Sequence, residues 1–327
     1  MDIDLSTLRL IEHEKEIPFH TLVELIEQAL LTAYHRTEGA YPDARAELDT
    51  KTGTATIWAV EFDNDDNPIG EFDDTPDGFG RIAAMTARNI IHQRLRDVED
   101  ASVLGTFKNR EGEIVSGIIQ QGRDEHMIQV DLGEVEAVLP PHEQVPGEEY
   151  NHGNRIRVYV TDVHKGHKGP SITVSRSHPN LVRKLFAHES PEIADGTVEI
   201  VSLSREAGHR TKMAVRATVP GVNAKGACIG ELGSRVRAVM AELGEEKIDI
   251  VDYSDSPAKF VANALSPARA LRVDVLNEAQ KLARAVVPAE QLSLAIGKEG
   301  QNARLAAKLT GWKIDIVTPE DSAPNAD

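Results

Sequence analysis

The chain of 327 residues has one cysteine, few aromatic side chains, no long apolar run and no excess of basic residues. The lone Cys228 cannot form an internal disulfide or a thiolate cluster, so we expect a reducing compartment and a small core residue at this position. No apolar run approaches the about 18 residues of a membrane-spanning helix. The acidic residues 1–4 are unlike a secretory signal or a transit peptide. We therefore expect a cytoplasmic protein that is not embedded in a membrane.

Other ligand classes are also poorly represented. The twelve histidines show no zinc-binding spacing, and structural zinc sites need such spacing or several cysteines. We therefore expect neither a metal site nor a cofactor.

The formal net charge of −17 by itself argues against a nucleic-acid partner, but the charge is unevenly distributed along the chain. Residues 1–105 carry 9 Lys and Arg against 22 Asp and Glu, residues 106–177 carry 8 against 11, and residues 178–318 carry 19 against 17. Phosphate contact requires a local basic surface and not a basic protein. The last region therefore remains a candidate for nucleic-acid binding, whereas the acidic first third is typical of a protein-facing or solvated domain.

The least acidic region contains an internal repeat. Residues 229–237 and 296–304 each read as an apolar residue, Gly-x-x-Gly and an amphipathic helix, and each is followed by a strand spelled Lys-Ile-Asp-Ile-Val. A helix, two strands and a second helix precede each copy. Because repetition identifies the folding unit, we predict two domains of order α-β-β-α-α-β, over residues 178–252 and 253–318.

The Gly-x-x-Gly loops carry the chemistry. Two glycines permit positive φ and a close approach of the backbone to a nucleic acid. The helix that follows offers unpaired N–H groups and a partial positive charge to phosphate. A loop of this kind that clamps about four nucleotides is the signature of KH domains. One copy alone is weak evidence, but two copies in the same element order predict tandem KH domains that bind single-stranded RNA.

The candidate RNA-binding residues lie in and after these loops. The second loop carries Lys298 where the first carries the acidic Glu231, so we expect the second to hold phosphate more tightly. The basic side chains of the following helices either line the RNA or form ordinary solvated helix faces. The candidate set comprises Gly230, Gly233, Arg235, Arg237, Gly297, Lys298, Glu299, Gly300, Gln301, Asn302, Arg304 and Lys308.

Residues 106–177 read as five short strands punctuated by glycines, which is typical of a five-stranded OB-fold barrel, a common binder of single-stranded nucleic acid. Arg155, Arg157 and Tyr159 share one face of the fourth strand, because side chains alternate with period two. They form either a phosphate-binding and stacking patch or an exposed strand face. The first strand lacks the aromatic side chains of many RNA-binding barrels.

The pattern of residues 1–105 predicts an α/β domain. Together with the barrel and the two KH domains, it makes the whole chain a multidomain α+β protein. The pattern indicates a helix over residues 22–33, then a two-stranded hairpin, then a long helix over residues 80–101. Thr21 and Glu24 have the spacing of a capping box for the first of these helices. The last residues, 319–327, show no periodicity, and we expect them to be disordered.

The order of an acidic α/β domain, an OB-fold barrel and tandem KH domains resembles the NusA family of bacterial transcription factors. The resemblance covers nearly the whole chain, and its most specific stretches are residues 134–140, 143–148, 175–179, 244–251 and 294–306. It implies a regulator of RNA polymerase without enzymatic activity. In the family, the N-terminal domain docks on core polymerase near the RNA exit channel, while the barrel and both KH domains hold the emerging nascent or leader RNA.

The resemblance also implies effects on pausing, intrinsic termination and antitermination, with other antitermination factors as further partners. Some members of the family continue into acidic C-terminal repeats. The printed chain ends soon after the second KH domain, so we expect no regulation through such repeats. Nothing in the sequence indicates an obligate oligomer, and we expect a monomer.

Two other classes of function fit parts of the sequence. An RNA-processing enzyme, such as a phosphorolytic exoribonuclease, can carry barrel and KH modules that capture its substrate. Such an enzyme needs a catalytic core, and residues 1–105 contain no phosphate-binding glycine loop and no metal-site spacing at Asp73, Asp74 or Asp77. A ribosome-associated RNA-binding protein is the other alternative. We expect a non-enzymatic transcription factor.

Overall fold

The computed structural model describes residues 3–15, 17–63, 67–120, 122, 124, 126–166 and 169–321. Two compact units divide the chain: the first consists mainly of the residues up to Gly105, and the second of the residues from Thr106 onward. Most of the tail predicted to be disordered, residues 322–327, lies outside the described residues.

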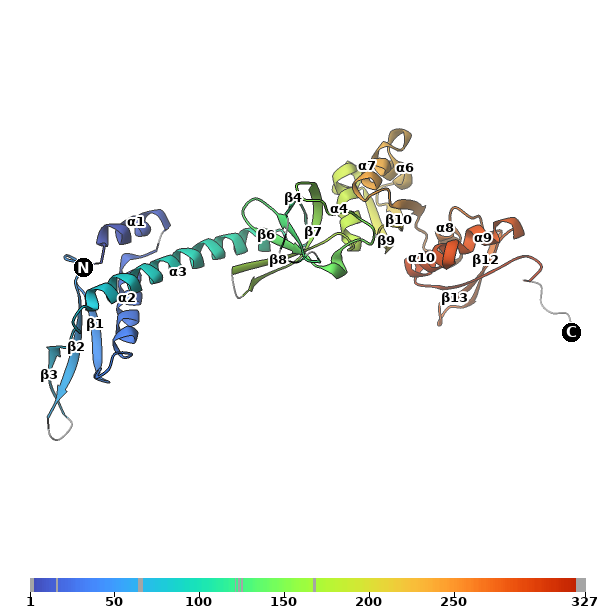
Figure 1. Ribbon diagram of the computed structural model, residues 1–327. Coiled ribbons are helices and arrows are strands. Elements are labelled where there is room, and N and C mark those ends of the chain that lie inside the picture. The colour runs from blue at the N-terminus through green and yellow to red at the C-terminus, as the bar shows by residue number, and fades with distance from the viewer. Residues whose placement is uncertain are drawn as a thin grey trace. The chain divides into compact units, whose positions relative to one another are not determined.

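The first unit combines helices with a small sheet (Figure 1). Its elements are α1 (Leu5–Lys15), α2 (Phe19–Tyr34), β1 (Ala44–Leu48), β2 (Ala55–Phe62), β3 (Pro68–Asp73) and α3 (Phe79–Lys108). The strands form an antiparallel sheet in the order β1-β2-β3. The buried stripe of α2 packs against the sheet and the start of α3, and this core includes Leu22, Ile26, Leu30, Leu48, Ile57, Phe79 and Ala83.

The predicted capping box of Thr21 and Glu24 at the start of α2 is wrong. The helix begins at Phe19, behind Pro18, and has no side-chain cap of its own. The N–H of Phe19 donates instead to the carboxylate of Glu12 at 3.1 Å. Thr21 therefore lies inside the first turn, where a capping hydroxyl has no role.

Two further elements of this unit differ from the predictions. Strand β3 was not expected, because it begins with a proline and is exposed along most of its length. Helix α3 continues past the predicted end near residue 101 to Lys108. Phe107 is buried near that end, so burial stabilises the added turns despite the glycine at position 105.

The second unit begins with a closed five-stranded barrel, as predicted. Its strands are β4 (Ile114–Gln120), β5 (Ile128–Asp131), β6 (Glu136–Leu139), β7 (Arg155–Gly166) and β8 (Gly169–Ser175). They close in the order β4-β5-β6-β8-β7. Alternate apolar side chains fill the interior, as the period of two requires, and these include Ile119, Val130, Ala137, Val158 and Ile172.

Two repeats of α and β elements follow the barrel. The first contains α4 (Pro179–Glu189), α5 (Pro191–Ala194), β9 (Val198–Glu206), β10 (Arg210–Ala217), α6 (Ala224–Ile229), α7 (Ser234–Glu242) and β11 (Lys247–Asp252). The second contains α8 (Pro257–Ala264), β12 (Arg272–Asn277), β13 (Leu282–Val286), α9 (Leu292–Ile296), α10 (Gln301–Thr310) and β14 (Lys313–Val317). Each forms a three-stranded sheet with one antiparallel and one parallel pairing. The predicted repeat is confirmed, with the short α5 as an addition to the first copy.

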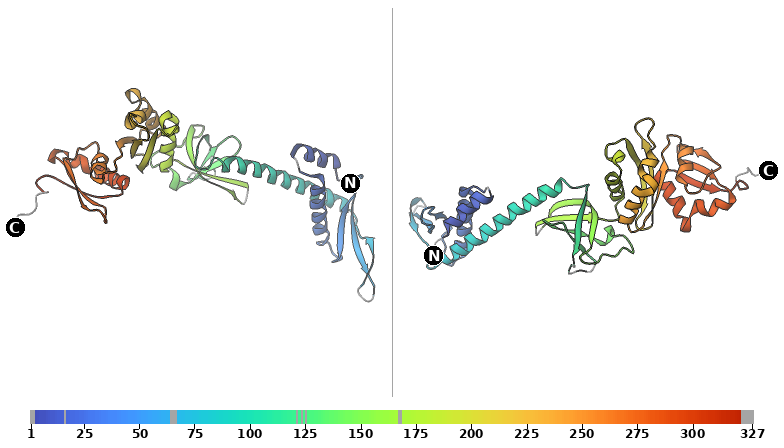
Figure 2. Two further views of the ribbon diagram at one scale, coloured as in Figure 1. Left: turned by 180° about the vertical axis from the view of Figure 1, so that it is seen from behind. Right: turned by 90° about the horizontal axis from the view of Figure 1, so that it is seen from above.

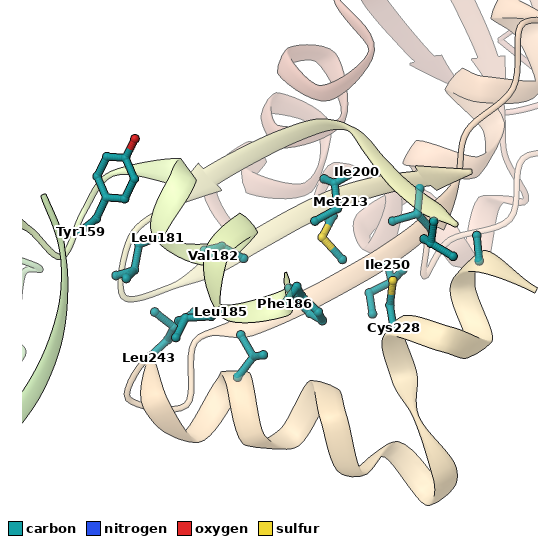
Figure 3. Close-up of a cluster of buried hydrophobic side chains, with 14 residues drawn as sticks. Tyr159, Leu181, Val182, Leu185, Phe186, Ile200, Met213, Cys228, Leu243 and Ile250 are labelled. Atoms are coloured by element: carbon teal, nitrogen blue, oxygen red, sulfur yellow. The ribbon is translucent and has the colours of Figure 1, made fainter. Parts of the chain in front are cut away.

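The sheet of the first repeat is covered on both faces. Met213, Val215 and Ile250 pack against helices of the same repeat, together with Phe186 and Cys228 (Figure 3). On the opposite face, Ala214 and Val251 pack against helices of the second repeat, so the two repeats lie side by side (Figure 2). The side chains that the second repeat contributes to this shared core include Phe260, Ala264, Ala306 and Leu309.

A buried ionic network joins the barrel to the first repeat. The guanidinium of Arg176, only 3% exposed, pairs with Glu148 of the barrel and lies 3.4 Å from Glu242 of α7. It also donates to the carbonyl oxygens of Arg157 and Glu242, at 2.9 and 2.8 Å. The carbonyl of Arg176 accepts in turn from Arg205, whose guanidinium is fully buried against Glu246 at 2.9 Å. Barrel and first repeat are therefore linked by a buried guanidinium and two partly buried carboxylates.

We expect Arg176→Met to destabilise the second unit by about 3–5 kcal/mol, because the variant leaves the Glu148 carboxylate and two carbonyl oxygens without their buried donor. The chain contains two tryptophans, so in a Trp58→Phe background the fluorescence of Trp312 reports urea unfolding of this unit alone. Lys184→Met is the control, since Lys184 joins the same two domains through an exposed pair with Glu113. Its cost should stay below about 1 kcal/mol, and equal costs for both variants would contradict the buried-network interpretation.

Candidate nucleic-acid interface

Both Gly-x-x-Gly loops adopt the same backbone conformation. In each loop the first glycine, the third residue and the last glycine have positive φ, the left-handed region that favours glycine. The φ values are 74°, 51° and 77° for Gly230, Leu232 and Gly233, and 77°, 53° and 73° for Gly297, Glu299 and Gly300. In both loops the N–H of the last glycine donates to the carbonyl of the first at 3.1 Å. The same loop shape therefore accommodates two different pairs of central residues.

The first glycine of each loop is required by a close contact. A Cβ atom at Gly230 would lie 2.6 Å from Cγ of Arg235, and one at Gly297 would lie 2.8 Å from the backbone nitrogen and Cβ of Asn302. Both partners stand five positions after the first glycine. The chain thus turns back onto the start of the following helix, which leaves no room for a side chain.

These partners support the loops from within the domain. Arg235 donates from Nη1 to the carbonyl of Ala227 at 2.6 Å and to the carboxylate of Glu192 at 2.7 Å. Asn302, only 2% exposed, donates from Nδ2 to the carbonyl of Ala295 at 2.9 Å and to another carbonyl of the second repeat at 3.0 Å. Both side chains hold the end of the helix that enters the loop. The geometry therefore gives Arg235 and Asn302 a positioning role beneath the loop.

Other predicted site residues do face solvent. The side chains of Arg237, Lys298 and Lys308 are exposed, and within the described part of the chain no ion pair or side-chain hydrogen bond engages them. At the tips, the first loop presents Glu231 and the 88% exposed Leu232, whereas the second presents Lys298 and Glu299. The two loops therefore share a backbone but differ in the chemistry of their tips.

The helix after the second loop contacts the first repeat. Arg304 donates from Nε to Glu206 of β9 at 2.6 Å, and Gln301 donates from Nε2 to the other oxygen of this carboxylate at 2.9 Å. The hydrogen bond from Arg304 lowers the pKa of Glu206. Arg304 also donates to the carbonyl of Glu299 at 3.1 Å. One carboxylate thus connects the second loop to the first repeat.

A cleft of about 810 Å³ lies between the turn after β9 and the second loop. Gly297, Gln301 and Asn302 of the loop region form part of its wall. Its lining includes the imidazole of His209 and the charged side chains of Glu206, Arg210, Glu245, Lys247, Lys298, Glu299 and Arg304. The cleft places several cations beside backbone N–H groups at the start of a helix, an arrangement that suits a phosphate backbone.

The predicted patch on the fourth barrel strand is divided by the first repeat. Tyr159 is buried, its ring stacks on His178 with centroids 4.6 Å apart, and its hydroxyl accepts from Asn180. Arg157 lies 3.8 Å from the carboxylate of Glu242, and only Arg155 is exposed. A base-stacking role for Tyr159 is therefore wrong, because α4 of the first repeat covers this part of the strand.

Two predictions concern the lone cysteine and metal binding. Cys228 is fully buried, and burial raises the pKa of its thiol to about 12, so it is an inert core residue as predicted. No group of three or more His, Cys, Asp or Glu side chains in the described ranges is arranged to hold a metal ion. Among the described helices, none combines the length and the hydropathy that crossing a bilayer requires.

An OB-type barrel followed by two KH-like repeats with paired Gly-x-x-Gly loops defines a multidomain RNA-binding protein. Family models match a NusA N-terminal domain at residues 5–62, an S1 RNA-binding domain at 108–175, and NusA-like first and second KH domains at 176–253 and 257–324. The chain belongs to the NusA family.

Curated relatives carry the name transcription termination/antitermination protein NusA. The protein from Mycobacterium tuberculosis is 58% identical, with 97% of this chain and 93% of the relative covered. Those from Bacillus subtilis and Thermus thermophilus are each 45% identical, with 97% and 94% of this chain and 91% and 88% of the relatives covered. The similarity therefore extends over all four predicted domains.

We expect Arg235→Gln and Arg237→Gln to weaken RNA binding in different ways. The slope of log K against log salt is negative, and loss of one phosphate contact reduces its magnitude by about 0.7 for single strands. Arg237, which is exposed, should show this change, whereas Arg235 should lose affinity with an unchanged slope because it supports the loop. Fluorescence anisotropy titrations at several salt concentrations measure both quantities. An equal fall in slope for both variants would show that Arg235 touches phosphate.

Proposed function

We propose that the chain is an RNA-binding transcription elongation factor that bridges RNA polymerase and nascent RNA and modulates pausing, termination and antitermination. The observation that carries the RNA side is the pair of Gly-x-x-Gly loops with one shared backbone, the second of which borders a cleft whose lining includes Arg210, Lys247 and Lys298. Membership of the NusA family supports the transcriptional role. The chain acts by binding and not by catalysis.

The RNA runs along the second unit. Gly230, Gly233, Gly297 and Gly300 allow the RNA backbone close to the start of α7 and α10, where the positive end of each helix dipole attracts phosphate. Arg237, Lys298 and Lys308 supply exposed charge beside the loops. On the barrel, Arg155 remains a candidate phosphate contact, while Arg157 is engaged by Glu242.

The first unit is the polymerase-binding part. It carries the largest share of the negative charge, and several large apolar side chains remain exposed on it. Ile82 and Met85 are one turn apart on α3, and Met85 is 68% exposed. Exposed apolar groups of this kind rimmed by charge are typical of protein-binding surfaces. The partner is core RNA polymerase, and the factor acts as a cytoplasmic monomer, with other antitermination factors joining the complex.

The bridging function is tested with the full chain and separable variants. Gly297→Asp with Gly300→Asp should abolish binding of a single-stranded leader RNA by steric and charge effects, and leave polymerase binding intact. Ile82→Glu with Met85→Glu should do the reverse. Gel-shift and pull-down assays with core polymerase measure both. If the parent chain does not bind core polymerase, or if it copurifies with ribosomal subunits alone, the proposed partner is wrong. If the Ile82 and Met85 variant binds polymerase like the parent chain, this part of α3 is not the docking surface.

The two loop tips should contribute unequally. Lys298→Ala removes a cation beside the RNA and should cost about fivefold in affinity, since a charge pair at 4 Å is worth on the order of 1 kcal/mol in water. Glu231→Ala removes a repulsive charge and should leave affinity equal or higher. Anisotropy titrations at low salt compare the two. If neither change alters RNA affinity, the second loop is not the stronger phosphate site.

A further inference from the structure

The carboxylate of Glu206 accepts hydrogen bonds from side chains of α10, the helix that follows the second loop. Its two oxygens accept from Arg304 and Gln301, at 2.6 and 2.9 Å, and its side chain is only 20% exposed. Lys308 stands one helical turn beyond Arg304 on the same helix and adds to the positive field at this carboxylate. A planar anion is thus held by a guanidinium and an amide, in the manner that such groups hold a phosphate.

The first repeat offers an internal comparison. Arg237 stands seven positions after the first glycine of its loop, and Arg304 stands seven positions after that of the second. Within the described part of the chain Arg237 has no ion pair, whereas Arg304 is neutralised by Glu206. The positions of Gln301 and Lys308 correspond to Ser234 and Ala241 in the first repeat. The second repeat therefore places an amide and a cation beside the shared arginine where the first has a serine and an alanine, and within the described residues a carboxylate pairs with the arginine of the second repeat only.

We propose that Gln301, Arg304 and Lys308 form a binding subsite for an RNA phosphodiester, which Glu206 occupies as an internal substitute until RNA displaces it. The proposal rests on the proposed function, because it takes RNA as the ligand of this helix. The subsite lies beyond the Gly-x-x-Gly loop itself, on the side that faces the cleft.

Displacement of Glu206 leaves the two repeats joined. The hydroxyl of Ser204 donates to the carbonyl of Leu305 at 2.8 Å, and this hydrogen bond is buried. The apolar core shared by Ala214, Val251 and the helices of the second repeat is also independent of Glu206. Opening the subsite therefore breaks one partly exposed ion pair and the hydrogen bond from Gln301, and leaves the interface that positions the helix.

The substitution Glu206→Gln tests the proposal, because it keeps the size of the side chain and one carbonyl acceptor while it removes the competing charge. We expect about fivefold tighter binding of an unstructured, fluorescein-labelled single-stranded leader RNA at low salt. The salt slope should become steeper by about 0.7, as one more cation becomes available to phosphate. Glu245→Gln is the matched control: it removes the same charge from the same cleft without contacting Arg304, and should change affinity less than twofold.

A second substitution distinguishes two roles of Glu206, which either competes with RNA for Arg304 or orients Arg304 toward RNA. Arg304→Gln should cost little in the parent chain, about twofold, and about fivefold in the Glu206→Gln background. Thermal melts confirm that each variant is folded. If the parent binds RNA and Glu206→Gln binds equally or more weakly, Glu206 orients Arg304 and the proposal is overturned. If the parent chain binds no RNA at all, the proposed function itself fails.

Discussion

The packing of the second repeat against the back of the first sheet determines the geometry of the candidate RNA-binding surface. Small side chains allow this close approach, because Ala214 of the sheet meets Ala264 and Ala306 of the helices in one core. The buried Lys212 joins the two repeats by directional hydrogen bonds. Its ammonium donates to Asp249 of the first repeat at 2.9 Å and to the carbonyl of Ser266 of the second at 2.6 Å. The packing of the two repeats brings Glu206 of the first within reach of Arg304 of the second.

Features that depend on local patterns could be predicted from the sequence. Periodicity predicts the repeat and the five barrel strands. The glycines predict the two loops, because glycine readily adopts the positive φ that such loops require. The same reasoning correctly placed Cys228 in a core. The prediction failed where two local signals compete. At α2, Pro18 and Glu12 mark the start of the helix, and the Thr21 and Glu24 spacing is not used as a capping box.

Features that depend on distant residues could not be predicted. Arg235 and Asn302 have the spacing of exposed residues after a loop, but a nearby glycine backbone and carbonyl oxygens draw them inward. Tyr159 lies on the expected strand face, which the following domain then covers. Glu206 stands 98 residues before Arg304, and nothing in either stretch alone indicates that they meet. Their roles are set by packing between segments and not by sequence pattern.

The common backbone of the two loops has a consequence for how such a protein diversifies. The glycines and the side chains beneath them set the loop shape, and the third position of each loop must also accept a positive φ, which β-branched residues disfavour. Within that limit, one backbone conformation carries tips of different chemistry. Glu231 and Leu232 in one copy, against Lys298 and Glu299 in the other, give the two repeats different preferences for contacts along a single RNA.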